Sequence, residues 1–370
     1  MQVVRNGDVL YVGHTGTSGA GTSILDVADP ANPKLVTQWD APAKTHTHKV
    51  QVADGLLLVN HELFPYKSTP TGEHSAGLAV YELSDPLRPR QIGFWSSGGR
   101  GVHRIVYTGG RYAHVSAIPE GFRDRIWVVI DLSDPTNPVE ATRWWVPGQH
   151  VDEEPVVMQS DHAHHRVAAH HALVADNVAY LGYDDSNLIV LDVSDITKPR
   201  KIGECVWGGG ATHTCLPLPG KNLLVVTDEQ QTDGPGAPER LIHLVDIENP
   251  AEPRYLRPLP APDAAYDTLP RRFGPHNLHE NQAGAFSSER LVFASYFSAG
   301  VRVYDLADRD DPREIAHWVP EGTVPDQTIQ INDLFVDSDK LIWATERHES
   351  GVYVLEAEGN LAQLMNEESS

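Results

Sequence analysis

A short motif that recurs along the whole chain limits its fold more than any other feature. Each copy is an apolar run, an acidic residue, and then Asp-Pro or a close variant with a second Pro behind it, as in Ala79–Pro86 with Pro89. The first acidic residues of the copies are Asp26, Glu82, Asp131, Asp192, Asp246, Asp305 and, in a degenerate copy, Glu356, a mean step of 55 residues. Self-similarity at such a step indicates a repeat architecture.

Each repeat has the pattern of four short strands. In the second repeat the expected strands are Lys49–Ala53, Leu56–His61, Leu78–Leu83 and Arg90–Trp95, and Asp54-Gly55 is a tight-turn signal between the first two. The Asp-Pro-x-x-Pro segment is expected to turn the chain between strands three and four, because Asp caps its own backbone and Pro fixes φ. Four-stranded units repeated radially predict an all-β, seven-bladed β-propeller with four antiparallel strands per blade. Tandem β-sandwiches are the alternative, but each unit is too short for one.

The repeats are expected to fill one domain, residues 1–370. Their limits are expected near 1–42, 43–98, 99–148, 166–208, 210–262, 274–320 and 325–365. In the first repeat, Gln2–Asn6 matches the second half of an inner strand and Val9–Gly13 matches strand two. Leu361–Leu364 is the only candidate for an outer strand of the last repeat, so the ring closes on that short strand or leaves a loose seam.

Composition excludes several classes of function. The 370 residues carry a formal net charge of -22, which disfavours nucleic acid and anionic membranes as partners. No apolar run is long enough to span a bilayer, and no signal peptide is recognised at the start. The two cysteines, Cys205 and Cys215, form no disulfide framework. These features predict a cytoplasmic protein with a small-molecule substrate and leave the oligomeric state open.

Histidines recur at one position of the repeat. Counting back seven residues from the turn between strands one and two leads to His48, His103, His170 and His213 in four successive repeats. The sixth repeat offers His276 or His279, and the seventh has Gln330. First strands line the channel of a propeller, so these imidazoles are expected to form a ring around its axis. Strand alternation places His46 on the same face as His48.

Carboxylates follow the same turns on the second strands. They are Glu62, Glu120, Asp184, Glu229 and Glu346. A carboxylate that holds one ring nitrogen of a histidine while the other binds a metal is a common arrangement around metal sites. The pattern therefore predicts one divalent transition metal bound by His48, His103, His170, His213 and His276, with these carboxylates behind them. The alternative is that the histidines fill the channel with water-bridged hydrogen bonds.

Other residues suggest further roles. His46 or His279 is predicted as a proton shuttle, because imidazole titrates near working pH. Arg271 and Arg272, in an insertion, are predicted to bind an anionic group of a substrate, with salt bridges to nearby acids as the alternative. The insertion 149–165 is expected to be a polar loop, with a lid or a second metal site as alternatives.

The motif Ile189–Asp195, Ile-Val-Leu-Asp-Val-Ser-Asp, resembles the LVIVD-repeat family of β-propeller proteins over nearly the whole chain. Carotenoid cleavage oxygenases are similar in the architecture of the proposed site, which in that family implies four axial histidines and Glu around non-haem Fe(II). Selenium-binding proteins, which include methanethiol oxidases, look like more distant relatives.

The first hypothesis is therefore a metal-dependent enzyme with oxygenase-type or lyase/isomerase chemistry. An all-imidazole ligand set favours Fe(II) or Mn(II), with Cu and Zn next. The alternatives are a non-catalytic interaction scaffold, a copper-dependent thiol oxidase-like protein, and metal storage or sensing without turnover.

Overall fold

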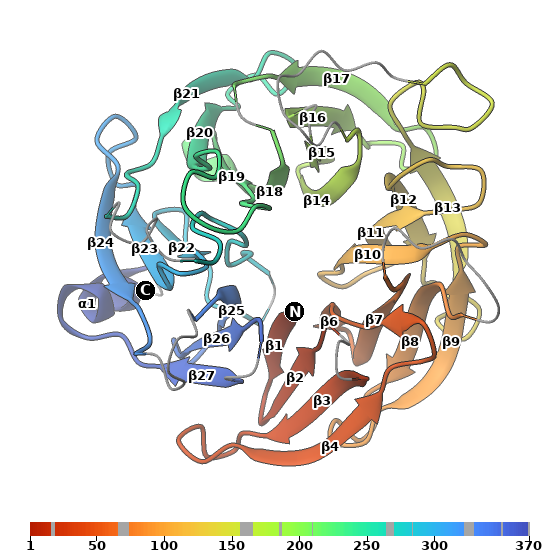
Figure 1. Cartoon of the computed structure of the whole chain (residues 1–370), viewed down its shortest axis with the longest axis horizontal. Coiled ribbons are helices and arrows are strands. Elements are labelled where there is room, and N and C mark those ends of the chain that lie inside the picture. Colours follow the sequence, from red (N-terminus) through yellow and green to blue (C-terminus); the bar gives the residue numbers. More distant parts are fainter. Residues whose placement is uncertain are drawn as a thin grey trace. The chain divides into compact units, whose positions relative to one another are not determined.

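The computed structural model describes residues 1–15, 19–65, 74–155, 166–184, 187–208, 210–263, 270–282, 284–321, 329–348 and 351–368. The chain divides into two compact units. Unit 1 is Met1–Ser186 with Leu191–Lys201, and unit 2 is Asn187–Val190 with Ile202–Ser370. Nearly all regular structure in the described residues is β-strand (Figure 1). No helix among them is long and apolar enough to cross a membrane.

Unit 1 begins with a four-stranded antiparallel sheet of order β1-β2-β3-β4. Its strands are β1 Gln2–Asn6, β2 Val9–Gly13, β3 Ala20–Asp26 and β4 Lys34–Asp40. A nine-stranded sheet follows, of order β13-β12-β11-β10-β7-β8-β9, with β5 and β6 both paired to β7. Its strands are β5 Thr45–His46, β6 Val50–Ala53, β7 Leu56–Leu63, β8 Gly77–Glu82, β9 Arg90–Ser96, β10 Gly101–Val106, β11 Tyr112–Ile118, β12 Ile126–Asp131 and β13 Val139–Trp144. It is two four-stranded repeats, in the first of which β5 and β6 are the two parts of one inner strand, joined at one residue pair, Gly101 with Glu62.

The fourth repeat forms a sheet of its own, with strand order β14-β15-β16-β17. The division between the units runs through the last two of these strands. Its strands are β14 Ala169–Ala175, β15 Val178–Tyr183, β16 Asn187–Asp192 and β17 Arg200–Cys205. Unit 2 continues with β18 Thr212–Leu218, the 3-10 helix η2 Pro219–Lys221, β19 Leu223–Asp228, β20 Ile242–Asp246 and β21 Arg254–Pro258. Two three-stranded sheets complete it, with β22 Leu291–Ser295, β23 Val301–Asp305, β24 Arg313–Trp318, β25 Ile331–Val336, β26 Ile342–Glu346 and β27 Val352–Leu355.

The predicted all-β class and the antiparallel four-stranded repeat are confirmed, and the first two strands of the first repeat, Gln2–Asn6 and Val9–Gly13, begin and end where expected. The number of blades stays a prediction. In the sixth repeat the inner segment is irregular and joins β22 through an isolated bridge between Leu278 and Ala294.

The prediction of an outer strand at Leu361–Leu364 is wrong. These residues lie in helix α1, Gly359–Glu367, which buries Leu361, Leu364 and Met365 against the core of β22–β27. The spacing i, i+3, i+4 of these three residues is the helical period, so the short apolar segment has a pattern that only a helix can bury on one face.

The turn chemistry predicted for the repeat motif is present in its successive copies. The backbone N–H two residues after the Asp donates to its carboxylate in each of them, with N···O distances of 3.1 Å for Leu87 to Asp85, 3.0 Å for Thr136 to Asp134 and 3.1 Å for Thr197 to Asp195. Such local capping competes with strand hydrogen bonds and therefore ends strand three where the motif begins.

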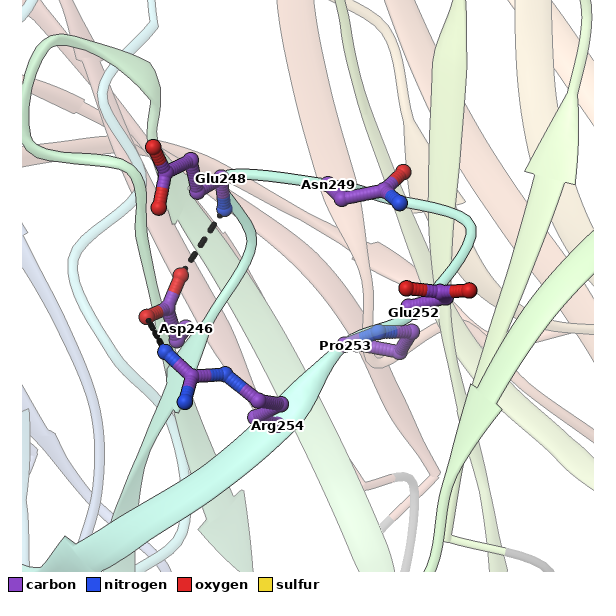
Figure 2. Close-up of a pocket in the computed structure, with 6 residues that line it drawn as sticks. All are labelled: Asp246, Glu248, Asn249, Glu252, Pro253 and Arg254. Atoms are coloured by element: carbon purple, nitrogen blue, oxygen red, sulfur yellow. Dashed lines mark hydrogen bonds and ion pairs between the residues drawn. The ribbon is translucent and has the colours of Figure 1, made fainter.

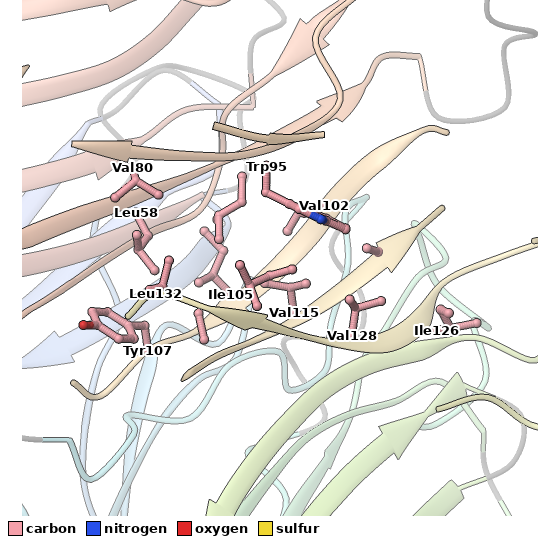
Figure 3. Packing of buried hydrophobic residues seen from close by; sticks show 14 of the residues in the cluster. Leu58, Val80, Trp95, Val102, Ile105, Tyr107, Val115, Ile126, Val128 and Leu132 are labelled. Atoms are coloured by element: carbon pink, nitrogen blue, oxygen red, sulfur yellow. The ribbon is translucent and has the colours of Figure 1, made fainter. Parts of the chain in front are cut away.

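Glycines in the fourth strands allow neighbouring repeats to approach. A Cβ on Gly93 would lie 2.2 Å from the carbonyl oxygen of Pro135, in the turn of the next repeat. Gly203 stands in the same relation to Pro250, at 2.6 Å. Behind these contacts, the repeats of unit 1 share an apolar core that includes Leu58, Val102 and Val128 (Figure 3). This packing holds the inner strands that carry the histidines.

Candidate metal centre

Each histidine of the predicted series lies at an irregularity of its inner strand. The register of β10 with β11 shifts between Val102 and Arg104, so His103 is an extra residue in the strand. The same shift occurs around His170 in β14 and around His213 in β18. Between β5 and β6, three residues that include His48 face only two on β7. A bulged residue lies outside the hydrogen-bond ladder, so its side chain is freed from the strand alternation.

The corresponding residue of the seventh repeat is Asn332, and the expectation of Gln330 is wrong. The register of β25 with β26 shifts between Ile331 and Asp333. The sequence count failed because the turn after Val336 is longer than in the other repeats: Val336 pairs with Ile342, whereas Ala53 pairs with Leu56. Counting from the turn therefore missed the bulge by two positions.

Four histidines of unit 1 lie side by side. The ring centroids are 4.2 Å apart for His46 and His48, 5.0 Å for His48 and His103, and 5.0 Å for His103 and His170. His46, His48 and His170 are buried, and the side chain of His103 is 14% exposed. We call these four residues together with Glu62 the unit 1 centre. Three of its members, His46, His48 and Glu62, offer ligand atoms within 4.8 Å of one another.

Glu62 connects two of the imidazoles. One of its carboxylate oxygens, Oε2, lies 2.8 Å from Nε2 of His46 and 2.8 Å from Nδ1 of His103. Burial opposes ionisation of this carboxyl, but the histidine donors outweigh it and hold its pKa well below its usual range. Burial also lowers the pKa of His103, to about 3. At neutral pH, an ionised Glu62 therefore accepts a hydrogen bond from a neutral His103.

This hydrogen bond determines which nitrogen of His103 can bind a metal. With the ring hydrogen on Nδ1, the lone pair is on Nε2. That atom lies 3.2 Å from Nε2 of His170. Two nitrogen ligands bound at about 2.1 Å to one ion lie about 3.0 to 3.4 Å apart in octahedral or tetrahedral geometry. The two Nε2 atoms are thus spaced either as a hydrogen-bonded pair or as two ligands of one ion, with Glu62 behind His103.

His48 has a different local environment. Its Nδ1 lies 3.1 Å from the side-chain nitrogen of Asn60. Burial lowers the pKa of His48 well below its usual value, and the neighbouring His46, Lys49 and His103 add to this effect. His48 is therefore a neutral imidazole inside the centre.

A second group lies in unit 2. His213, Glu229 and His276 offer ligand atoms within 4.8 Å of one another. Nδ1 of His276 donates to the carbonyl oxygen of Asn332 at 2.5 Å, and Nδ1 of His213 lies 3.0 Å from the hydroxyl of Thr214. Nε2 of His276 lies 3.7 Å from Oε1 of Glu229. The sequence offers His276 or His279 in the sixth repeat, and His276 is the one that belongs to this group.

His279 does not fit the predicted role of proton shuttle. Its Nε2 donates to the carbonyl oxygen of Phe286 at 2.7 Å, and its Nδ1 accepts the backbone N–H of Val336 at 3.2 Å. The ring also packs edge-on against Phe293 and Phe335. Both nitrogens are occupied by backbone groups, so neither is left for a substrate. His46, the other predicted shuttle, lies in the unit 1 centre with Nε2 on Glu62.

The environment of His279 predicts a dependence of stability on pH. Burial lowers its pKa from 6.5 to about 4. Between these values the unfolded chain binds more protons, so the free energy of unfolding falls on acidification, by up to about 1.4 kcal/mol per pH unit for this group. We expect His279→Gln to remove the contribution of one titrating proton from the pH dependence of the free energy of unfolding. Urea unfolding curves between pH 6.5 and 4 measure this dependence. His317→Gln, an exposed control on β24, should leave it unchanged, and equal slopes in both variants contradict the assignment.

The predicted carboxylates lie in different environments. Glu62 and Glu229 lie beside imidazoles. Glu120 is exposed, beyond the end of β11. Asp184 pairs with Arg125 at 3.0 Å, and Glu346 accepts the backbone N–H groups of Gln330 and His348. Glu120 therefore does not lie behind a histidine, and this part of the prediction is wrong. Asp184 lies opposite Ala168, two residues before His170, just as Glu62 lies opposite His46, two residues before His48. The supporting roles of Asp184 and Glu346 stay predictions.

The two arginines of the insertion form the salt bridges that were the alternative. Arg272 contacts Glu229 at 3.0 Å and Asp233 at 3.6 Å, and Arg271 lies 4.0 Å from Asp233. Their predicted role in binding a substrate has no support from these contacts. The insertion at 149–165 falls partly outside the described residues.

Sequence reasoning missed a series of polar residues on the second strands, each opposite a bulge. Asn60 donates to the carbonyl oxygen of Val102 at 2.7 Å, Ser116 to Ala169 at 2.6 Å, Thr227 to His276 at 2.8 Å and Ser295 to Asn332 at 3.1 Å. Each hydrogen bond reaches the inner strand of the next repeat, at or beside its bulged residue. The signal in the sequence is a single polar residue that ends an apolar run inside the strand, as in Leu-Leu-Leu-Val-Asn60.

We expect Ser116→Ala to weaken unit 1 and its centre together. The hydroxyl is buried and bonds to the residue before His170, so its removal leaves a buried carbonyl without that donor, at a cost of about 1 to 2 kcal/mol. Urea unfolding and metal titration measure both effects. Ser84→Ala, at an exposed serine, is the control; a Ser116→Ala protein as stable as that control contradicts the role.

A surface hollow of about 650 Å³ lies elsewhere, at the repeat turn of unit 2. It is lined by Asp246, Glu248, Asn249, Glu252, Pro253 and Arg254 (Figure 2). The Arg254 guanidinium donates to Asp246, which also caps the N–H of Glu248. These are the turn contacts of the repeat, and none of the histidines lines the hollow.

Comparison with known proteins supports the fold and the repeat. The sequence profile of the LVIVD repeat matches residues 109–145 and 169–206. No curated protein sequence matches the chain. Among solved structures, the periplasmic gluconolactonase PpgL of Pseudomonas aeruginosa is similar, with a TM-score of 0.62, 13% identity and 94% of each chain covered. A hypothetical selenium-binding protein from Sulfolobus tokodaii has a TM-score of 0.62 and 14% identity, covering 93% of this chain and 83% of that one. At these identities the likeness shows the β-propeller type of fold alone. The chain therefore carries LVIVD repeats on a β-propeller type of fold, as its repeated Asp-Val-Ser-Asp motif predicts.

Proposed function

We propose that this chain is a metal-dependent enzyme that acts on a small organic substrate. The observation that carries the proposal is the pair of Nε2 atoms of His103 and His170, 3.2 Å apart, with Glu62 holding the other nitrogen of His103. Two imidazoles so spaced, with a buried carboxylate fixing one of them, suit a transition-metal ion better than a channel filled only by hydrogen bonds.

The residues present fit such an ion. The unit 1 centre has imidazole donors and one carboxylate, a set suited to Fe(II) or Mn(II), with Cu and Zn next. His213 and His276 stay predicted ligands through Nε2, because Nδ1 of each contacts an oxygen of the protein. Both cysteines are buried free thiols, and burial raises the pKa of each, which disfavours thiolate ligation.

When bound, the ion would act as a Lewis acid or activate water or oxygen, which are the lyase/isomerase and oxygenase types of chemistry. The protein's own groups do the rest. His103 and His170 bind the ion, and Glu62 fixes the tautomer of His103. His46 holds a proton between its Nε2 and the same carboxylate oxygen, next to the ligands. That a gluconolactonase of P. aeruginosa has a similar fold supports a small-molecule substrate.

The proposed compartment is the cytoplasm. It is supported by the two free cysteines, which do not pair with each other. The similar gluconolactonase is periplasmic, so fractionation of cells that express the native chain is the test, and recovery in the periplasm or medium would contradict the cytoplasmic assignment.

Metal analysis of protein purified without a nickel column tests the proposed function. We expect about one equivalent of a single transition metal, or its uptake on reconstitution. Occupancy below about a tenth of an equivalent, with no uptake, rejects the enzyme hypothesis and leaves the interaction scaffold. The latter also predicts that partner binding survives when His103 and His213 are replaced by Ala.

A further inference from the structure

The side-chain amide of Asn60 has a fixed orientation. Its oxygen accepts the backbone N–H of Lys49 at 2.7 Å, and its nitrogen donates to the carbonyl oxygen of Val102 at 2.7 Å. A flipped amide would place a donor against the N–H and an acceptor against the carbonyl, so both backbone groups oppose it. The atom that faces His48 is therefore the amide nitrogen, 3.1 Å from Nδ1 of that ring.

The orientation of Asn60 determines the tautomer of His48. An amide nitrogen only donates, so Nδ1 of His48 must accept. A neutral imidazole that accepts at Nδ1 carries its hydrogen on Nε2, which is then a donor and has no lone pair in the ring plane for a metal. This is the opposite of His103, whose hydrogen is held on Nδ1 by Glu62.

The Nε2–H of His48 is a buried donor. The residue is 4% exposed, and within the described part of the chain its Nε2 has no hydrogen-bond partner. A buried donor without an acceptor is costly, so few of them occur in folded proteins without a ligand or a water to accept the hydrogen. The ring lies against His46 on one side and His103 on the other, inside the unit 1 centre. A ligand in that centre is the group such a donor would serve.

The charges around the centre favour an anionic ligand. Lys49 is 2% exposed and Arg125 is 3% exposed. Both are cations close enough to His103 to interact with it electrostatically. Arg125 is paired with Asp184. Glu62 is the one carboxylate of the unit 1 centre, so a divalent metal ion would leave the centre with net positive charge.

We propose that His48 is a hydrogen-bond donor to an anionic oxygen of the substrate, of the carboxylate or enolate class, and is not a metal ligand. This inference rests on the proposed metal function. It reassigns a residue that the sequence pattern groups with the ligands. Where the oxygen is that of an enolate, an N–H directed at its developing negative charge inside a buried site stabilises the transition state more than the ground state.

Nitrogen NMR of histidine-labelled, metal-free protein tests the tautomer. We expect the hydrogen of His48 on Nε2 and that of His103 on Nδ1. Asn60→Asp replaces the amide donor by an acceptor and should move the hydrogen of His48 to Nδ1. A hydrogen on Nδ1 of His48 in the unmodified protein overturns the proposal. Because no metal is present, this result does not depend on the proposed function.

Anion binding to metal-loaded protein tests the role. Trifluoroacetate, a carboxylate probe, is titrated and followed by fluorine NMR. We expect His48→Phe, which keeps the ring but lacks the N–H, to retain its metal and bind the probe about tenfold more weakly. His317→Phe, on the exposed part of β24, should bind like the unmodified protein.

The remaining outcomes separate the two proposals. Loss of metal from a folded His48→Phe protein would show that His48 is a ligand and overturn the inference while supporting the metal centre. Retained metal with unchanged probe affinity also overturns it. No metal in any of the proteins rejects the proposed function, and the NMR experiment then still decides the tautomer.

Discussion

Replacement of His103 by Ala is expected to abolish metal binding. The variant removes one nitrogen of the Nε2 pair and releases Glu62 from one of its two imidazole donors. Loss of groups behind a ligand costs about 10- to 100-fold in metal affinity, so loss of the ligand itself should exceed about 100-fold. Metal content by mass spectrometry, and titration of the metal-free protein, measure the effect.

A graded series makes this result specific. Glu62→Gln keeps the shape of the side chain but loses its charge, and we expect an intermediate loss of about 10- to 100-fold. His317→Ala removes an exposed histidine of β24 and should bind as the unmodified protein does. Full metal occupancy in a folded His103→Ala protein would refute the centre. Parallel measurement on His213→Ala tests the sequence prediction that His213 is a ligand of the same single ion: both variants should then lose the whole equivalent.

Gly101→Ala is expected to damage the fold and the centre at once. Gly101 has φ of +98° and is the residue at which β10 pairs with Glu62 of β7. A Cβ there would lie 2.0 Å from the carbonyl oxygen of His61. The backbone strain alone is about 1 to 3 kcal/mol, and the clash with fixed backbone should bring the loss of unfolding free energy above about 3 kcal/mol. Because the contact is with the residue next to Glu62, metal affinity should fall as well.

Gly110→Ala is the matched control for this variant. Gly110 lies after β10, at the turn to β11, and has φ of +79°, but nothing lies within 4 Å of its Cβ position. We expect a loss of about 1 kcal/mol from the strained backbone and no change in metal affinity. Urea unfolding and metal titration of both variants give the comparison. Equal losses of stability would mean that the approach of Gly101 to His61 carries no energetic weight.

The fold was predictable because its signals are local. The Asp that caps its own turn and the Pro behind it act within four residues, so the repeat can be read without knowledge of contacts. The histidine register was also readable for His48, His103, His170 and His213, because each is counted from a short turn. Where the turn is longer, as before Ile342, the count failed.

The partners of the histidines were less predictable. Glu62 pairs across the sheet with His46, and its contact with His103 comes from the neighbouring repeat. Glu120 follows the same sequence rule but is exposed beyond the end of β11, a difference that a single sequence does not reveal. The role of His48 depends on the orientation of Asn60, which two backbone groups of different strands determine. Such information is tertiary and has no local pattern.

The bulges have a consequence for how such a protein can change. A bulged residue makes no ladder contact, so its side chain can be exchanged while the strands on either side keep their pairing. The seventh repeat already has Asn332 where others have His, with β25 and β26 paired on both sides of it. The bulged position of each such inner strand can therefore hold a metal ligand, a hydrogen-bond donor or a neutral residue. Each of these positions can change independently of the others. New chemistry can arise by single substitutions, without rebuilding the sheet that supports it.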